Sequence, residues 1–322
     1  MISVVIPLYN KEHTIVKTLQ TVLNQTFKGY EVVVVNDGST DNSVQAVQNY
    51  TSDSRIKIIN QENQGVSGAR NTGVENAQFN YIAFLDGDDE WFPTYLEKMK
   101  EAIDTFPNKE MYCSAGMGKN AKGEYRPRQI NKYKKQIVEF DFFENPHVFL
   151  HVGAVVVTKK LFKKAGGFPL GMKRNEDFAF LYKAALITQP IYSGFPLSVY
   201  VSNVEGQATA TSIYESKKLL DDTIERYNMV YKLYDSLEKK NKSFLVFMKY
   251  ELRHVFMINT LKQEFKTNTY FLKTLDNKII KQFNPIEIFL LKRSKEFKFS
   301  IVMLVKASKV LWRFKGYQRV RQ

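Results

Sequence analysis

Apolar and polar positions change in regular blocks along the first half of the chain. Short apolar runs rich in β-branched residues predict strands, and their lack of alternation is typical of strands buried on both faces. The predicted strands are 2–9, 30–37, 55–61, 81–86 and 151–157. Between them, apolar residues recur every three or four positions, which predicts amphipathic helices. The predicted helices are 14–25, 65–77, 93–106, 158–168 and 175–187, with a further helix start after the turn sequence DGSTDNS.

This alternation of strands and helices predicts an α/β fold, with a mostly parallel sheet covered by helices. Ligands of such sheets bind at the carboxyl ends of the strands. Asp37 and Asp86 fall at two of these ends. The polar and basic stretch 118–136 predicts a loop or mobile segment.

The last third of the chain differs in both pattern and charge. After residue 212 the pattern is helical to the end, with Pro285 as one clear break. Residues 217–322 hold 24 Lys and Arg against 10 Asp and Glu, whereas the preceding residues hold 23 of each. We therefore expect two domains, 1–212 and 213–322, and an anionic partner for the second, either a membrane surface or nucleic acid.

The chain lacks the sequence signals of several classes of protein. The chain begins directly with an apolar strand, so we expect no secretory signal, and no apolar run approaches the length of a membrane-spanning helix. The single cysteine, Cys113, has no partner for a disulfide or a metal motif, and the four histidines show no metal-ligand spacing. No G-x-G-x-x-G, G-x-x-x-x-G-K-[ST] or G-x-S-x-G motif is present.

The stretch FLDGDDEWF, residues 84–92, places four acids directly after a predicted strand. Asp86 and Asp88 flank a glycine, so their carboxylates can converge on one Mg²⁺ or Mn²⁺ ion that also binds a substrate diphosphate. The alternative is an Asp-Gly turn with solvated acids. We expect Asp89 and Glu90 to cap the following helix.

A second acidic pair, Glu176 and Asp177, opens a predicted helix. Acids at this position can simply stabilise the first turn through the helix dipole. The functional interpretation is a general base that removes a proton from an attacking hydroxyl.

Five blocks of sequence, in order over about residues 1–200, resemble the family 2 glycosyltransferases with the GT-A fold. The blocks are SVVIPLYN, QTFKGYEVVVVNDGSTDNS, NQGVSGARNTGVENA, YIAFLDGDD and GGF…NEDFAFLYKAAL. The resemblance implies an inverting, metal-dependent enzyme that moves a sugar from a nucleotide diphosphate sugar, most simply a UDP-sugar, to a hydroxyl. The implied pathway is bacterial surface polysaccharide biosynthesis, such as capsule or O-antigen, with a glycan or lipid-linked glycan as acceptor.

The resemblance also implies a role for each matching residue. Pro7 and Tyr9 would line the nucleobase pocket, and Asp37 would accept a hydrogen bond from the base. Arg70 would lie near the nucleotide. Asp86 would approach the ribose, and Asp86 and Asp88 would hold Mn²⁺ or Mg²⁺ on the diphosphate. Asp177 would be the catalytic base, supported by Glu176.

Three departures from the family pattern change these expectations. Asn36 stands where the family usually has a first aspartate, and Lys183 stands where an arginine often closes the Glu-Asp segment. Lys cannot make the planar two-pronged contact of Arg, so acceptor or phosphate binding can differ. The Gln-x-x-Arg-Trp motif of processive synthases is absent, which favours transfer of a single sugar.

Alternative functions remain open from the sequence. A sugar transferase acting directly on a lipid phosphate, as in relatives of dolichol-phosphate-mannose synthase, would have the same donor site. A nucleic-acid-binding protein would explain the basic tail, but the neutral first 216 residues favour an enzyme with no nucleic acid partner. An inactive scaffold is disfavoured by the intact Asp86, Asp88 and Asp177.

The final predicted helix carries two neighbouring arcs. Lys306, Lys309 and Arg313 lie within about 60° of one another on a helical wheel. The apolar arc consists of Ile301, Leu304, Val305, Leu311 and Trp312. This pattern predicts a helix that lies in an anionic membrane interface, on the inner face of the cell membrane. The alternative is a helix that packs on the protein or on a second subunit in a homo-oligomer.

Overall fold

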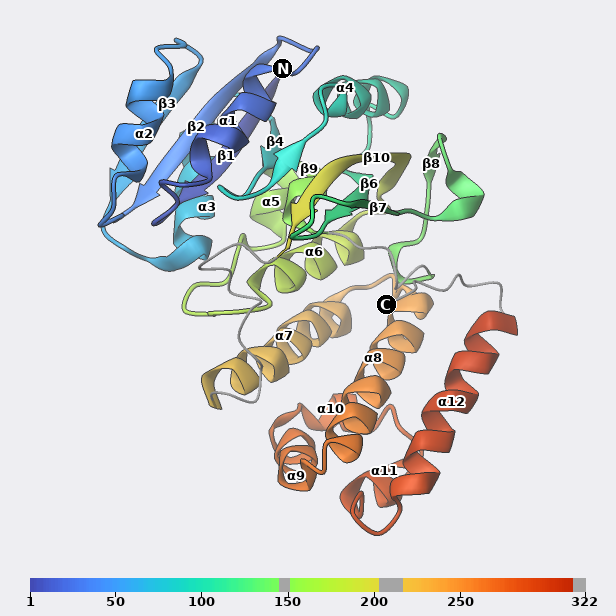
Figure 1. Cartoon of the computed structure of the whole chain (residues 1–322). Helices are drawn as coiled ribbons and strands as arrows, with labels where there is room; N and C mark the ends of the chain where they lie inside the picture. Colours follow the sequence, from blue (N-terminus) through green and yellow to red (C-terminus); the bar gives the residue numbers. More distant parts are fainter. Residues whose placement is uncertain (145–150, 203–216, 315–322) are drawn as a thin grey trace. The chain divides into compact units, whose positions relative to one another are not determined.

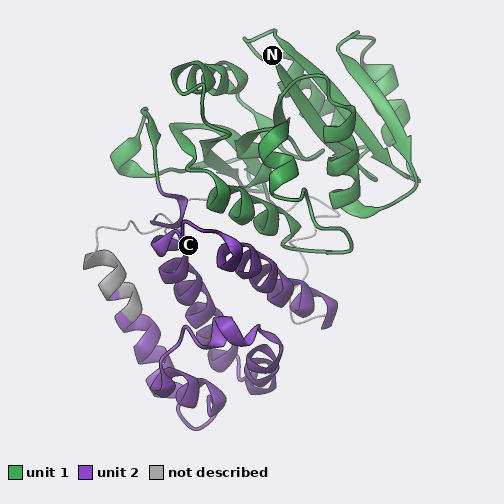
Figure 2. Ribbon diagram, turned by 180° about the vertical axis from the view of Figure 1, so that it is seen from behind, with its two compact units in different colours: residues 1–140, 148–215 green, residues 141–147, 216–322 purple. Residues whose placement is uncertain are grey.

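The computed structural model describes residues 1–144, 151–202 and 217–314, with side chains on the last helix described up to Ala307 and at Val310. The chain folds into two compact units, coloured separately in Figure 2. Unit 1 comprises residues 1–140 and 148–215, and unit 2 comprises residues 141–147 and 216–322. The domain boundary predicted between 212 and 213 lies outside the described residues.

Unit 1 is built on one mixed sheet with the strand order β3-β2-β1-β4-β9-β6-β10-β5 (Figure 1). Strand β7 pairs with β6, and β8 pairs with β10. The strands are β1 Ile2–Leu8, β2 Tyr30–Asp37, β3 Ile56–Gln61, β4 Tyr81–Phe84, β5 Glu90–Trp91, β6 Met111–Lys119, β7 Tyr125–Arg128, β8 Ile137–Glu139, β9 Val155–Thr158 and β10 Ile191–Val201. Strands β3, β2, β1 and β4 run parallel, whereas β9 joins β4 and β6 antiparallel.

The helices cover both faces of the parallel strands. Helices α1, α2 and α4 share one apolar core with alternate β1 residues, including Val4 and Ile6. Helix α3 packs on the opposite face of β1, where a Cβ at Gly73 would lie only 2.2 Å from Val5 Cγ1. The helices of this unit are α1 Ile15–Leu23, α2 Ser43–Tyr50, α3 Gly65–Asn76, α4 Tyr95–Thr105, α5 Lys159–Lys164 and α6 Glu176–Ile187, with 3₁₀ turns η1 Asn131–Tyr133 and η3 Val152–Ala154.

The predicted α/β fold with a helical C-terminal region is confirmed, and the strands predicted between residues 2 and 86 are present. The sequence analysis did not assign β6 or β10. The segment 118–136 is not a simple loop, because β7 pairs with the end of β6 to form a hairpin. The expected capping by Asp89 and Glu90 is wrong: Glu90 lies in β5, and Thr94 precedes the first turn of α4.

Unit 2 is helical. Its elements are the 3₁₀ turn η2 Phe142–Glu144 and helices α7 Lys217–Ser236, α8 Lys242–Leu261, α9 Phe265–Thr274, α10 Asn277–Ile280, α11 Pro285–Lys292 and α12 Lys298–Phe314. Pro285 begins α11, where a missing N–H costs nothing, and Asn284 and Glu287 form a capping box around it. Among the described residues, no helix combines the length and apolarity needed to span a bilayer.

Helix α12 corrects the predicted membrane-facing arc. Ile301 and Val305 are buried, with exposed fractions of 0% and 1%, and α12 packs against α8. These two residues therefore belong to the core of unit 2 and cannot enter a lipid surface in this fold. The side chains of Lys309, Leu311, Trp312 and Arg313, which completed the predicted arcs, lie outside the described residues.

Candidate active site

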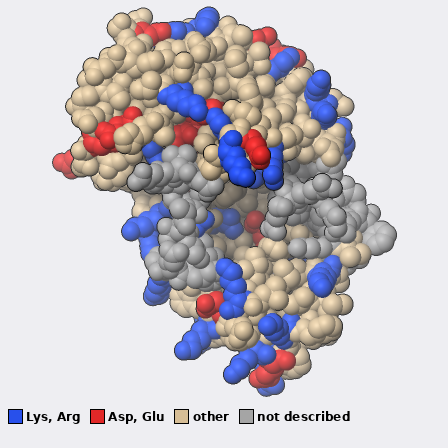
Figure 3. Space-filling model, viewed as in Figure 1, with Lys and Arg blue, Asp and Glu red and all other residues tan. Residues whose placement is uncertain are grey.

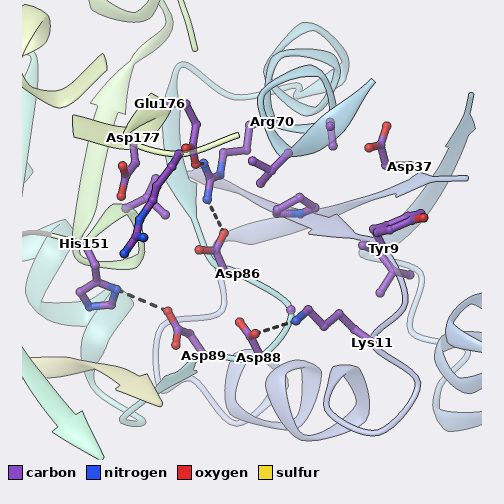
Figure 4. Close-up of a pocket in the computed structure, with 18 of the residues that line it drawn as sticks. Tyr9, Lys11, Asp37, Arg70, Asp86, Asp88, Asp89, His151, Glu176 and Asp177 are labelled. Atoms are coloured by element: carbon purple, nitrogen blue, oxygen red, sulfur yellow. Dashed lines mark hydrogen bonds and ion pairs between the residues drawn. The ribbon is translucent and has the colours of Figure 1, made fainter. Parts of the chain in front are cut away.

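A cavity of about 540 Å³ lies at the carboxyl ends of β1, β2 and β4, and all of its described lining residues belong to unit 1 (Figure 4). The first turns of α3, the start of α6 with the segment before it, His151 with the start of η3, and the end of β10 complete its walls. It brings together every residue to which the family resemblance assigned a role in binding or catalysis. These are Pro7, Tyr9, Asp37, Arg70, Asp86, Asp88, Glu176 and Asp177.

Tyr9 and Asp37 lie together at one end of the cavity (Figure 4). Tyr9 follows β1 and is 46% exposed, so its ring is accessible to a ligand. Asp37 ends β2 and is buried. One oxygen of its carboxylate accepts hydrogen bonds from Gln61 Nε2 at 2.7 Å and from the Gln64 backbone N–H at 2.9 Å. These bonds fix the carboxylate in place and leave it capable of accepting another.

Hydrogen bonds join the loops that follow β1 and β2. Asn10 has a positive φ of 50°, and its side-chain oxygen accepts a hydrogen bond from the Thr40 N–H at 2.9 Å. Asn36 accepts a hydrogen bond from the Ser39 N–H and donates one to Asn60. Asn36 therefore holds the turn through its amide, where the family usually has a carboxylate.

Arg70 connects the two acidic segments of the site. Arg70 belongs to α3, and its side chain is almost fully buried. Its guanidinium donates hydrogen bonds to Asp86 Oδ1 at 2.7 Å and to Glu176 Oε1 at 3.0 Å. Burial disfavours the charge of Arg70, but the two carboxylates more than offset this and raise its pKa. Arg70 thereby fixes the β4 end against the start of α6.

Lys11 pairs with Asp88, a contact that the sequence analysis did not predict. The two groups, Lys11 Nζ and Asp88 Oδ2, are 2.8 Å apart, and both side chains are mostly buried. The aliphatic part of the Lys11 side chain packs next to Gly87. A Cβ atom added at Gly87 would lie 3.5 Å from Lys11 Cγ. The Thr14 hydroxyl donates to the Gly87 carbonyl at 2.8 Å, which holds the turn against the start of α1.

Glu176 and Asp177 have different surroundings although they are adjacent. Burial, reinforced by the Asp177 carboxylate, raises the pKa of Glu176 to about 7, against the lowering effect of Arg70. Asp177 is only half-buried, and its Oδ1 accepts a hydrogen bond from the Phe178 N–H at 2.7 Å. The preceding Asn175 has a positive φ of 65°, a conformation that Asn tolerates better than most residues.

A second network in the cavity wall was missed from the sequence. Asp89 is buried and accepts a hydrogen bond from the Val201 N–H at 3.0 Å, and its Oδ2 lies 3.5 Å from His151 Nδ1. His151 Nε2 lies 2.9 Å from the Ser198 hydroxyl, which donates to the Gly153 carbonyl. Burial raises the pKa of Asp89 to about 6, although His151 opposes the rise. Asp89 therefore ties the β4 end to β10 instead of capping a helix.

Lys183 and Glu90 lie outside the group of described residues that line the cavity. Lys183 is further along α6, where burial lowers its pKa. Glu90 forms ion pairs with Lys17 at 2.6 Å and Lys119 at 2.9 Å. The Arg-to-Lys departure at position 183 therefore does not alter the described cavity wall directly.

Comparison with known proteins decides the family. The family model described as glycosyl transferase family 2 matches residues 3–166, half of the chain. The chain belongs to this family. The match contains the ends of β1, β2 and β4 and Arg70 of α3, whereas Glu176 and Asp177 follow it.

Relatives of this family 2 chain include glycosyltransferase GlyA of Streptococcus pneumoniae serotype 4, which is 45% identical over 103 residues. That match covers 32% of this chain and only 15% of GlyA. Among solved structures, S. aureus TarS 1–349 in complex with UDP-GlcNAc has a TM-score of 0.73 at 19% identity and covers 99% of this chain and 93% of its own. The mannosyltransferase PcManGT from Pyrobaculum calidifontis, in complex with GDP-Man and Mn²⁺, has a TM-score of 0.59 at 17% identity and covers 97% and 87%. These structural similarities establish the GT-A fold.

Proposed function

We propose that this chain transfers a single sugar from a nucleoside diphosphate sugar to an acceptor hydroxyl, with inversion at the anomeric carbon. One observation carries the proposal: the order of groups along the cavity in Figure 4. An aromatic ring and a fixed acceptor, Tyr9 and Asp37, lie at one end, and Asp177 lies near the other. Asp86 and Asp88 lie between them. This order matches the base, diphosphate and sugar of an extended donor.

The base of the donor would stack on Tyr9 and donate to Asp37. The exposed Tyr9 ring and the fixed Asp37 carboxylate support this assignment. TarS was solved with UDP-GlcNAc and PcManGT with GDP-Man, which supports a nucleotide sugar as the ligand class. We propose a UDP-sugar as the donor of this chain.

The carboxylates at the centre of the cavity fit a divalent cation that is shared with the substrate. One oxygen of Asp86 is engaged by Arg70, and one oxygen of Asp88 is engaged by Lys11. No cluster of three or more His, Cys, Asp or Glu side chains that could hold a metal ion occurs in the described part of the chain. Mg²⁺ and related ions commonly bind one or two carboxylates and take their other oxygens from phosphates and water. We therefore expect Asp88, with Asp86, to hold Mn²⁺ or Mg²⁺ when the diphosphate is present.

When bound, the cation would stabilise the negative charge that develops on the departing diphosphate. Lys11 would then be released from Asp88 and could contact a phosphate oxygen. Arg70 would keep Asp86 oriented, because its guanidinium also binds Glu176. Positive charge would thus surround the leaving group in a partly enclosed cavity.

Asp177 is the proposed base. Glu176 is held by Arg70 and has a pKa raised to about 7, whereas Asp177 also lines the cavity and is more exposed overall. Asp177 would accept the proton of the acceptor hydroxyl as its oxygen forms a bond to the anomeric carbon. The bond from that carbon to the diphosphate oxygen would break on the opposite face, which inverts the configuration. The nucleoside diphosphate would leave with the bonding electron pair.

The proposed acceptor is a glycan or lipid-linked glycan of bacterial surface polysaccharide biosynthesis. A direct transfer to a lipid phosphate is the second candidate, because its donor site would be the same. The two candidates differ in product. A sugar on a hydroxyl gives a glycoside that survives mild acid, whereas a sugar on a lipid phosphate gives an acid-labile phosphodiester.

Substitutions at the base end of the cavity test the donor orientation. We expect Tyr9→Ala and Asp37→Ala to weaken UDP and UDP-sugar binding by the same factor, because neither residue would contact the sugar. Isothermal titration with both ligands in Mn²⁺ measures this factor. Tyr50→Ala, a change at a partly exposed tyrosine outside the cavity, is the matched control. A loss confined to the intact nucleotide sugar would place these residues at the sugar instead.

A further inference from the structure

Helix α12 presents a second apolar face, opposite the one that packs in the core of unit 2. Phe299, Met303 and Val310 are 76%, 47% and 46% exposed. At 100° per residue they fall within about 40° of one another, which makes one continuous stripe. We call these three residues the α12 stripe. Ile301 and Val305 lie on the other side of the helix and are buried, so the stripe is not needed for the core.

The neighbouring helix α11 adds more exposed apolar surface. Ile286 is 71% exposed and Phe289 is 47% exposed, and α11 packs against α12. Single exposed apolar side chains are ordinary on protein surfaces. Five large exposed apolar side chains on two adjoining helices are less common, and such concentrations mark interaction surfaces.

Four exposed lysines lie on this surface or close to it in the sequence. Lys306 lies on the same face of α12 as the stripe, within about 60° of each of its members. Exposed lysines also precede and begin the helix. They are Lys292, Lys295 and Lys298. None of these four lysines forms an ion pair with an acidic side chain among the described residues.

Few acids oppose these cations. Glu287 is buried and pairs with Arg253, and Glu296 pairs with Arg293 at 3.7 Å. Residues 281–322 contain 11 Lys and Arg against these 2 acids, a net charge of +9. On the face drawn in Figure 3, blue groups outnumber red ones over the helical unit. The surface is thus both apolar and strongly cationic.

We propose that the α12 stripe and its lysines bind the surface of an anionic lipid bilayer. The aromatic and aliphatic side chains would enter the interfacial region, and the lysine ammonium groups would reach the lipid phosphates. A symmetric contact between two copies of this chain is disfavoured, because it would place the same patch, and hence lysine against lysine, on both sides. The inference rests on unit 2 alone and does not depend on the proposed function.

Vesicle flotation of the full chain tests the proposal. The probes are vesicles of phosphatidylcholine alone and of phosphatidylcholine mixed with phosphatidylglycerol. We expect binding to the anionic vesicles only, and we expect added salt to weaken it. The apolar variant carries Phe299→Ser and Met303→Ser, and its matched control carries Val246→Ser and Leu261→Ser at exposed positions of α8.

A charge variant provides a second and independent test. It changes four lysines of the surface to glutamine, Lys292, Lys295, Lys298 and Lys306. Its control changes four exposed lysines elsewhere in unit 2, Lys232, Lys239, Lys266 and Lys273. We expect each surface variant to lower vesicle partitioning by about tenfold or more, and both controls to bind as the unaltered protein does. Unchanged melting temperatures establish that the variants are folded.

Three results would overturn the proposal. The first is equal binding to neutral and anionic vesicles. The second is that the unaltered chain self-associates and does not bind vesicles, and that the apolar variant no longer self-associates in sedimentation velocity. This result would assign the stripe to a contact between copies. The third is salt-dependent binding to nucleic acid with no binding to vesicles.

Discussion

Asp177→Asn should lower the turnover of sugar transfer by about 10² or more, the usual effect of removing a general base. The amide keeps the size of the side chain and its ability to accept from the Phe178 N–H, but it cannot take the proton of the acceptor hydroxyl. Affinity for UDP should stay the same, because Asp177 would not contact the base or the diphosphate. Release of UDP in the presence of donor and acceptor measures turnover, and titration with UDP measures affinity.

Glu176→Gln is the matched control for this prediction. It removes one of two carboxylates that flank the buried Arg70, so we expect weaker donor binding and a lower melting temperature. We expect less loss of turnover at saturating donor than in Asp177→Asn. Normal turnover in Asp177→Asn together with a large loss in Glu176→Gln would move the base by one residue.

Asp88→Asn should remove most activity, by about 10² or more, because the charge that develops on the diphosphate would lose its stabilisation. Excess chelator should have the same effect on the unaltered protein, and added Mn²⁺ should restore activity there but not in Asp88→Asn. Direct Mn²⁺ binding, followed by electron paramagnetic resonance with and without UDP, gives a measure independent of activity. We expect tight binding only with UDP present, since the described residues offer few protein ligands.

Lys11→Gln distinguishes the role of Asp88 from that of its ion-pair partner Lys11. It leaves the Asp88 carboxylate and removes the cation that competes with Mn²⁺ for it. Mn²⁺ should therefore bind Lys11→Gln at least as tightly as the unaltered protein in the absence of UDP. Full transfer activity in excess chelator, for the unaltered protein, would contradict a role for the cation.

The sequence was sufficient to predict where the parallel strands end, and this determined most of the site. Each of β1, β2 and β4 is mainly apolar, with three or more consecutive apolar residues, and the first polar or exposed residue after that apolar stretch marks its carboxyl end. Parallel strands bring these ends together, which is why Tyr9, Asp37 and Asp86 lie in one cavity. The resemblance to the family added Asp177, whose place could not follow from strand order alone.

Strands β6 and β10 were not predicted because Gly, Ser and Pro interrupt their apolar residues. β10 contains Gly194 and Pro196, and its pairing with β6 shifts register around Pro196. Proline in a strand is tolerated only at edges or bulges and argues against a strand in sequence alone. The Asp89–His151 contact depends on β10 and spans 62 residues, so no local pattern pointed to it.

On helix α12, Ile301 and Val305 were assigned to the membrane-facing arc, and this part of the prediction is wrong for a different reason. The two faces of α12 are both apolar, and a helical wheel cannot say which one packs against the rest of the protein. Packing against α8 buries Ile301 and Val305, so Phe299 and Met303 are left exposed. The choice between the faces is made by tertiary contacts with a helix about fifty residues earlier in the chain.

The most direct test of the account is the melting temperature of the full chain against a panel of nucleotides, with and without Mn²⁺. The panel contains UDP, GDP, UDP-GlcNAc, UDP-glucose, UDP-galactose and GDP-mannose. We predict that UDP and at least one UDP-sugar raise the melting temperature in Mn²⁺, and that the rise is lost in Asp37→Ala and reduced without the metal. A ligand at about 100 times its Kd should add roughly 2.7 kcal/mol to the free energy of unfolding. No change in melting temperature with any of these nucleotides, in the presence or absence of Mn²⁺, would contradict the proposed sugar-nucleotide site.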